Sequence, residues 1–176
     1  MTAASDQSLG MHPDTGLVQV ICRTPEELRP LAEAVAMVVE PGDIVFLRGE
    51  LGAGKTALTQ MLARALGVGE EQYVSSPSFA LLHEYMGNIP IFHMDLYRLR
   101  DEEDVEAAGL LDALGQNGVC IIEWPDRLGS LTPDAHLEVH IRQDAETSRR
   151  LELAPRGPSW EKRMARIAEH LARAKE

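Results

Sequence analysis

Residues 49–56 read Gly-Glu-Leu-Gly-Ala-Gly-Lys-Thr and match the phosphate-binding pattern G-x-x-x-x-G-K-[ST]. The flanking residues constrain the fold more than the match itself does. Residues 43–47 are a short apolar run typical of a buried strand, and residues 57–66 carry apolar side chains at helical spacing. A chance glycine-rich turn would not have both flanks. The sequence therefore predicts a P-loop nucleotide site in an α/β domain.

The chemistry of this loop depends on its glycines, its lysine and its threonine. Glycines let backbone N–H groups turn inward around an anion, and the N-terminus of the following helix adds to the positive field. Lys55 is predicted to reach the outer phosphates, and the Thr56 hydroxyl to ligate Mg²⁺. The loop residues expected to contact the nucleotide are Glu50, Leu51, Gly52, Ala53, Gly54, Lys55 and Thr56.

Chain length and charge limit the organisation of the protein and its partners. With 176 residues, we expect a flexible N-terminal tail at 1–16 and a single P-loop domain at 17–176. The formal net charge of −11 means that the surface as a whole repels nucleic acid. DNA is therefore not an expected partner, and contact with tRNA requires a local basic patch or another protein.

The remaining composition is typical of a cytoplasmic protein. No apolar run approaches the roughly 20 residues that a membrane-spanning helix needs, and residues 1–16 lack the apolar centre of a signal peptide. Cys22 and Cys120 both lie in apolar, strand-like runs. Such cysteines are typical of buried reduced thiols, not of a disulfide or a metal site. We expect no contact with a membrane.

A hairpin is predicted in the middle of the chain. Residues 79–85 and 89–95 are rich in β-forming side chains and are separated by a Gly-Asn turn at 87–88. An antiparallel pair there departs from an all-parallel P-loop sheet. Further strands are predicted at 17–22, 119–122, 137–141 and 150–153. A helix is predicted from Thr24 through Val38, capped by Thr24 and bent by Pro30, and residues 101–106 are predicted to be the acidic N-terminus of another helix. A terminal amphipathic helix begins near Ser159, and its pattern favours docking on the core over an RNA-binding surface.

Two carboxylates are candidates for the chemistry beside the P-loop. Ligands of open α/β sheets bind at the carboxyl ends of the strands. Glu123 follows the apolar run 119–122, where a Walker-B-type strand carries its acidic residue, and can hold Mg²⁺ directly or through water. The alternative is a surface glutamate. Asp95 ends the second hairpin strand, and it either acts on the attacking water or the metal shell, or caps the next turn.

Several other side chains have both a functional and a structural interpretation. Ser76 and Ser78 either supply a hydroxyl near the γ-phosphate or belong to a plain turn. Trp124 either stacks near the nucleotide or packs against the sheet edge. Four histidines show no paired ligand spacing and are interpreted as structural or surface residues: His83, His93, His136 and His140.

Four motifs, taken together, resemble one protein family. They are the P-loop at 49–56, Ser-Pro-Ser-Phe at 76–79, Asp-Leu-Tyr-Arg at 95–98 and Ile-Glu-Trp-Pro at 122–125. In this order and spacing they resemble the TsaE family, small bacterial ATPases of tRNA threonylcarbamoyladenosine synthesis, over roughly residues 17–155. The P-loop is common, whereas the last two motifs in succession are specific. The resemblance implies an α/β fold: a P-loop NTPase-like three-layer sandwich with a mixed parallel/antiparallel central sheet.

The resemblance also implies roles for individual residues. Lys55 and the loop backbone would bind the phosphates of ATP, and Thr56 and Glu123 would hold Mg²⁺. Asp95 and Trp124 become functional residues, which gives Lys55, Asp95 and Glu123 as the catalytic set.

Two further positions and two departures follow from the same resemblance. Thr24 resembles a position near the nucleotide, and Arg149 or Arg150 resembles a late arginine that reaches it, with Arg149 favoured. Ser78 replaces the usual threonine and keeps its hydroxyl, whereas Ala57 replaces a second hydroxyl after the loop.

For function, the resemblance implies ATP binding and slow hydrolysis that supports a partner complex similar to TsaB with TsaD. That complex forms threonylcarbamoyladenosine next to the anticodon of tRNA, so this chain would meet tRNA indirectly. The alternative is a small-molecule kinase, which needs an acceptor site and usually an arginine-rich lid. Between Glu123 and Arg142 the sequence has a single arginine, Arg127, whereas such a lid usually contains several. A regulatory GTPase would need an Asn-Lys-x-Asp guanine reader, which the sequence lacks.

Overall fold

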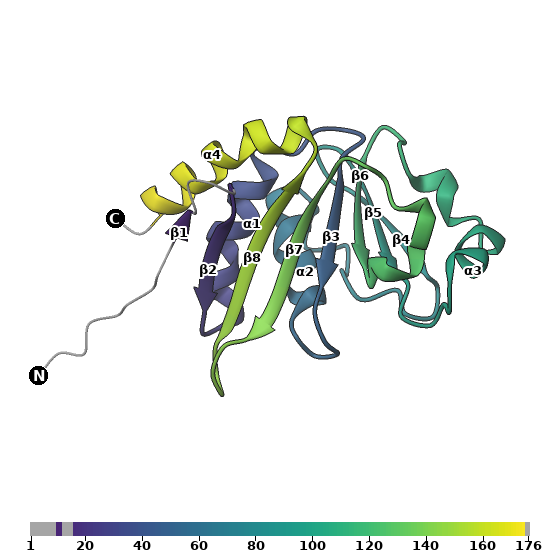
Figure 1. Ribbon diagram of the computed structural model, residues 1–176, viewed down its shortest axis with the longest axis horizontal. Coiled ribbons are helices and arrows are strands. Elements are labelled where there is room, and N and C mark those ends of the chain that lie inside the picture. The colour runs from purple at the N-terminus through teal and green to yellow at the C-terminus, as the bar shows by residue number, and fades with distance from the viewer. Residues whose placement is uncertain (1–9, 12–15, 175–176) are drawn as a thin grey trace, which may run out of the picture.

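In the part of the chain that the structure describes, eight strands form one sheet in the order β1-β2-β8-β7-β3-β6-β5-β4 (Figure 1). This computed structural model describes residues 10–11 and 16–174. Most of the expected tail at 1–16 lies outside the described residues, but Gly10–Met11 within it form β1 and pair with β2. The other strands are β2 (Val18–Cys22), β3 (Ile44–Arg48), β4 (Leu82–Met86), β5 (Pro90–Asp95), β6 (Val119–Glu123), β7 (His136–Gln143) and β8 (Arg149–Arg156).

Parallel pairing in the middle of the sheet and antiparallel pairing at both ends confirm the predicted mixed sheet. β3 pairs in parallel with β6 on one side and with β7 on the other, and β5 pairs in parallel with β6. β4 adds to β5 in antiparallel fashion, which confirms the hairpin. β8 and then β2 extend the sheet in antiparallel fashion from β7. The carboxyl ends of β3, β6 and β5 therefore meet at one edge, where ligands of α/β sheets bind.

Three α-helices cover one face of the sheet: α1 (Arg29–Ala36), α2 (Lys55–Ala65) and α4 (Pro158–Arg173). Their apolar sides share one core cluster with alternate strand residues such as Val45, Leu47 and Ile121. Figure 1 shows α1 and α2 behind the sheet, with α4 along its upper edge beside α1. Within residues 16–174, none of the helices is long and apolar enough to cross a membrane.

The opposite face of the sheet is covered over part of its width. α3 (Glu102–Ala107) and the 3-10 segments η2 (Leu110–Ala113) and η3 (Pro125–Leu131) lie over β3, β6 and β5. Their core cluster includes Phe46, Met94 and Ile122, which alternate with the residues of the first cluster. The three-layer sandwich is thus confirmed on the half of the sheet that carries the P-loop. On β7 and β8, the same face shows polar side chains.

Glu138 on β7 is the centre of this polar surface. Its side chain is 8% exposed and accepts hydrogen bonds from Arg48 (3.1 Å) and Arg156 (3.0 Å), with His140 Nε2 3.3 Å away. Burial alone would raise the pKa of Glu138, but the hydrogen bonds from Arg156 and His140 and the charge of Arg48 lower it to about 2. Arg48 also pairs with Asp126 in η3. The carboxylate therefore links β7 to the residue that precedes the P-loop.

The helix predicted from Thr24 through Val38 is divided. A 3-10 segment, η1 (Pro25–Leu28), precedes α1, which begins at Arg29 with Pro30 in its first turn. This division fits the predicted bend. The predicted side-chain cap is wrong: the Thr24 side chain makes no capping hydrogen bond, and its backbone carbonyl accepts from the Glu27 N–H instead (3.2 Å).

The terminal helix α4 docks on the core, as its pattern predicts. Trp160 is 1% exposed, and the Arg163 guanidinium lies 3.9 Å from the centroid of its ring. Arg163 also donates to the Asp43 carboxylate (Nη2–Oδ1 2.9 Å) and to the Val38 carbonyl (2.8 Å). One buried guanidinium therefore ties α4 to the turn before β3.

Candidate nucleotide and metal site

The P-loop joins the end of β3 to the start of α2. A Cβ at Gly49 would lie 2.6 Å from the Ile141 carbonyl oxygen, so a larger residue does not fit against β7. Gly54, directly before α2, has a φ of +113°, which side chains rarely adopt. The two glycines allow the loop to turn tightly around the helix N-terminus. The first N–H groups of a helix have no intrahelical acceptor and suit a phosphate.

Lys55 is the first residue of α2 and is only 5% exposed. Its Nζ donates to the carbonyls of Gly49 (2.7 Å) and Glu50 (2.8 Å) and lies 4.2 Å from the centroid of the Trp124 ring. Burial lowers the pKa of Lys55, while the charges of Glu123 and Asp95 act in the opposite direction. The amine is thus held inside the loop, within reach of the carboxylates that end β5 and β6.

Glu123 ends β6 beside the first turn of α2 and is 3% exposed. Its Oε1 accepts a hydrogen bond from Thr56 Oγ1 at 3.1 Å. Mg²⁺ in nucleotide sites typically takes one or two carboxylates together with phosphate oxygens, so a hydroxyl and a carboxylate in contact suit it. Among the described residues, no group of three or more His, Cys, Asp or Glu side chains could hold a metal ion by itself. The residues present therefore fit Mg²⁺ that is shared with nucleotide phosphates.

Asp95 ends β5 and is 4% exposed. Its Oδ1 accepts from the backbone N–H of Tyr97 (3.0 Å), and its Oδ2 accepts from the Ser76 hydroxyl (2.5 Å). The first bond is a turn cap, one of the two roles that the sequence left open. The second bond ties the carboxylate to the loop at 75–78. Asp95 also lines the same cavity as Lys55 and Thr56, so the cap does not remove it from the site.

The loop at 75–78 is fixed to the sheet by two neighbouring residues. Ser76 donates to Asp95, and the backbone of Ser75 is held by one phenol: Tyr85 Oη donates to the Ser75 carbonyl (3.1 Å) and accepts from its N–H (3.2 Å). Ser76 and Ser78 both line the cavity that contains Thr56. Both serines therefore line the same cavity as the P-loop, and a contact of either hydroxyl with the γ-phosphate stays a prediction.

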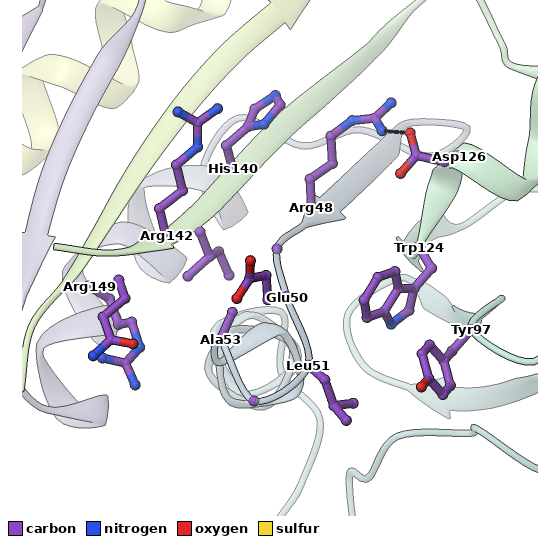
Figure 2. Close-up of a pocket in the computed structure, with 14 residues that line it drawn as sticks. Arg48, Glu50, Leu51, Ala53, Tyr97, Trp124, Asp126, His140, Arg142 and Arg149 are labelled. Atoms are coloured by element: carbon purple, nitrogen blue, oxygen red, sulfur yellow. Dashed lines mark hydrogen bonds and ion pairs between the residues drawn. The ribbon is translucent and has the colours of Figure 1, made fainter. Parts of the chain in front are cut away.

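Three cavities surround the P-loop. An inner cavity of about 400 Å³ is lined by Lys55, Thr56, Asp95 and Glu123, among others. A side cavity of about 240 Å³ lies next to the start of α2. An outer cavity of about 730 Å³ lies along the loop where β3 and β7 end (Figure 2). The inner cavity thus brings together the phosphate, metal and carboxylate candidates.

The side cavity contains the two remaining nucleotide candidates. Thr24 and Arg149 both line it, together with Gly54 and Ala57 of the loop and helix. Arg150, the competing candidate, instead pairs with Asp144 (Nε–Oδ1 2.8 Å) and lines none of the three cavities. The structure therefore places Arg149, and not Arg150, beside the P-loop.

Trp124 lies between the inner and outer cavities and lines both. Its backbone has a left-handed φ of +59°, and its ring centroid lies 5.0 Å from that of Tyr97 (Figure 2). The ring also packs against the second core cluster. The structure thus shows the packing role that the sequence allowed, and it also places the ring against the Lys55 amine. Stacking near a nucleotide stays a prediction.

His93 lies next to the candidate metal ligand Glu123, and the sequence analysis did not place it there. It is fully buried on β5, and its Nε2 lies 2.9 Å from Glu123 Oε1. The search for paired ligand spacing does not find it, because its partner is on another strand. A different signal was available: alternation along β5 places His93 on the same face as Asp95.

Comparison with known proteins gives one consistent result. A family model described as "Threonylcarbamoyl adenosine biosynthesis protein TsaE" matches residues 22–151. Two similar relatives are each named tRNA threonylcarbamoyladenosine biosynthesis protein TsaE. The one from Bacillus subtilis is 34% identical over 147 residues, which cover 83% of this chain and 90% of that protein. The one from Treponema pallidum is 34% identical over 137 residues, which cover 78% of this chain and 100% of that protein.

A solved structure agrees with these relatives. The crystal structure of Bacillus subtilis YdiB superimposes with a TM-score of 0.73 at 29% identity, covering 91% of this chain and 97% of that one. The matched range contains the P-loop, Asp95, Glu123 and Trp124. The chain therefore belongs to the TsaE family of threonylcarbamoyl adenosine biosynthesis proteins.

Proposed function

We propose that the protein binds ATP with Mg²⁺ and hydrolyses it slowly, in support of a TsaB–TsaD-type complex that forms threonylcarbamoyladenosine next to the anticodon of tRNA. One observation carries the ATPase part: the P-loop hydroxyl of Thr56 contacts the carboxylate of Glu123 in the cavity that Lys55 and Asp95 also line. The relatives' names supply the pathway.

The proposal gives a role to four residues of the inner cavity: Lys55, Thr56, Asp95 and Glu123. Lys55 and the loop N–H groups would bind the phosphates of ATP. Thr56 and Glu123 would hold Mg²⁺, which neutralises charge on the phosphate oxygens when it is bound. Asp95 would accept a hydrogen bond from the attacking water and orient it. Its bond to Ser76 would connect this step to the loop at 75–78.

The side cavity suits the nucleoside part of ATP. It adjoins the first turn of α2 and is lined by Thr24, Leu28 and Arg149. An apolar side chain and an arginine can pack against the two faces of a base. The sequence contains no Asn-Lys-x-Asp guanine reader, which favours ATP over GTP.

The charge of the chain supports an indirect relation to tRNA. A net charge of −11 opposes binding to a polyanion, so the partner proteins would hold the tRNA. The energy of ATP would then act on the state of the partners through segments near the γ-phosphate, such as the loop at 75–78. Because tRNA modification occurs in the cytoplasm, the proposal keeps the predicted cytoplasmic location.

A reconstituted modification assay tests this function. Threonylcarbamoyladenosine is measured with tRNA in excess over the TsaB–TsaD-type pair, with wild-type protein, Asp95→Asn or Asp112→Asn. Asp112 is an exposed aspartate in η2, outside the three cavities, and serves as the matched control. We expect Asp95→Asn to bind ATP but to fail in repeated rounds, while Asp112→Asn behaves as wild type.

The outcomes of this assay are distinct. Full yield from Asp95→Asn would remove the coupling role of Asp95. Wild-type protein that adds nothing to the yield of the pair would contradict the proposed function as a whole. The kinase alternative needs a separate measurement of ATP turnover, and turnover that requires a small-molecule acceptor would favour it. Arg127, the arginine that the sequence offers for a kinase lid, donates to the Arg100 carbonyl at 3.2 Å, which holds it against the segment just before α3.

A further inference from the structure

His93 and Glu123 form a buried contact across two parallel strands. The register partner of His93 is Ile121, and Glu123 is the next residue of β6 on the same face. His93 Nε2 lies 2.9 Å from Glu123 Oε1, and the two side chains are 0% and 4% exposed. The imidazole and the carboxylate therefore meet inside the fold, with almost no exposure to solvent.

The contact determines how the carboxylate is oriented. Oε1 of Glu123 faces two donors, Thr56 Oγ1 at 3.1 Å and His93 Nε2 at 2.9 Å. Within residues 16–174, no hydrogen bond involves Oε2, and Glu123 lines the inner cavity. Two donors on one oxygen restrict rotation of the carboxylate. Oε2 is then the oxygen left to face a ligand in that cavity.

The other ring nitrogen indicates that packing, such as the ring contact with Tyr85 (centroids 6.4 Å apart), is not the whole role of this histidine. His93 Nδ1 is buried and has no hydrogen-bond partner among the described residues. An unpartnered buried polar atom destabilises the folded state, and an apolar side chain at this position would avoid it. Neighbours on the same face include Ile91 and Ile121, which are apolar and fully buried. The contact with Glu123 is what an apolar residue could not provide.

We propose that His93 is a positioning residue that fixes the Glu123 carboxylate for Mg²⁺. The inference rests on the proposed function, in which Glu123 holds the metal with nucleotide phosphates. Groups that hold and orient metal ligands typically change metal affinity 10- to 100-fold when they are removed. His93 would thus act through Glu123 without touching nucleotide.

Three substitutions test this role. His93→Gln retains an N–H donor at about the reach of Nε2, His93→Asn retains an N–H donor that is too short, and His93→Leu removes it. The measurement is the Mg²⁺ concentration that gives half-maximal ATP binding in calorimetry, with the melting temperature recorded for every variant. We expect His93→Leu and His93→Asn to raise the midpoint about tenfold or more and His93→Gln to remain within about threefold of wild type.

A double variant separates positioning from general stability. If His93 acts through Glu123, adding His93→Leu to Glu123→Gln should leave the Mg²⁺ midpoint of Glu123→Gln unchanged. Lower melting temperatures with unchanged Mg²⁺ midpoints in both His93→Asn and His93→Leu would overturn the proposal and leave a packing role. If His93→Leu does not fold, the comparison of His93→Asn with His93→Gln decides. Wild-type protein that binds no ATP contradicts the proposed function itself, whereas normal wild-type binding with unaffected variants contradicts only this inference.

Discussion

Asp95 and Glu123 are direct register partners on the adjacent parallel strands β5 and β6. Parallel pairing brings the carboxyl ends of both strands to one edge, and alternation turns both carboxylates to the face that α2 covers. They nevertheless have different partners: Glu123 faces Thr56 of the P-loop, and Asp95 faces Ser76 of the neighbouring loop. In the proposed function, Glu123 would hold the metal, while the bond of Asp95 to Ser76 connects the site to the loop at 75–78.

Lys55→Ala should lose about 10- to 100-fold in ATP affinity while the fold remains intact. Hydrogen bonds to charged groups contribute roughly 1.5–3 kcal/mol, and the substitution removes the one cationic side chain at the N-terminus of α2. Isothermal calorimetry measures the affinity, and circular dichroism checks the fold. Lys162→Ala, on the exposed side of α4, is the control and should bind as wild type. Equal affinities for the two variants would contradict the assignment of the P-loop.

Trp124 should report nucleotide binding by its fluorescence. It lines the inner cavity next to Lys55, whereas Trp160 lies in the first turn of α4, is 1% exposed and lines none of the three cavities. We expect an ATP-dependent change in emission that persists in Trp160→Phe and disappears in Trp124→Phe. The reverse pattern would indicate that the nucleotide does not bind next to Trp124.

Arg163→Ala should destabilise the fold by about 3 kcal/mol or more, because it leaves the Asp43 carboxylate without its buried partner. For a domain of this size, such a change lowers the melting temperature by about 6–12 °C. The control is Arg173→Ala on the same helix. Its bond to Glu169 joins side chains that are 73% and 61% exposed, so calorimetry should show a shift of less than about 2 °C. Equal shifts would mean that the Arg163 pair contributes nothing beyond a surface contact.

In Glu138→Gln, the free energy of unfolding should decrease less between neutral and acidic pH than it does in the wild-type protein. The folded pKa of Glu138 is about 2, below its ordinary value of 4.5, so its contribution is complete above pH 4.5 and disappears as the pH falls toward 2. The difference amounts to about 3 kcal/mol at most. Urea unfolding between pH 7 and pH 3 measures it. A pH profile of Glu138→Gln that matches wild type would contradict this prediction.

The elements that the sequence predicts well are those with a local signal. The P-loop, the Gly-Asn hairpin and the apolar run before Glu123 each depend on neighbouring residues, and all three have the predicted form. Glu123 and Asp95 could be placed at one edge because each ends a strand.

Contacts set by register were not predictable from local pattern. Whether His93 meets Glu123 depends on how β5 aligns with β6, and nothing within either strand specifies that alignment. The cluster around Glu138 likewise depends on a face of β7 that the second helical layer does not cover. The prediction that the Thr24 side chain caps the helix was wrong although its local signal was present, because the chain begins this segment with a 3-10 turn.

The sheet combines hairpins of adjacent strands with a parallel centre, and this arrangement affects the order in which the protein folds. The β4–β5 and β7–β8 hairpins can each close within microseconds, because their strands are neighbours in the chain. β3 can pair only with strands that are distant in sequence, as Ile44 does with Cys120, and such pairings form slowly. Since the P-loop follows β3 and Glu123 ends β6, we expect the proposed ATP site to be completed by the last and slowest contacts of folding. A chain arrested earlier would contain both hairpins and retain no nucleotide, so ATP would bind and stabilise only molecules that have finished folding.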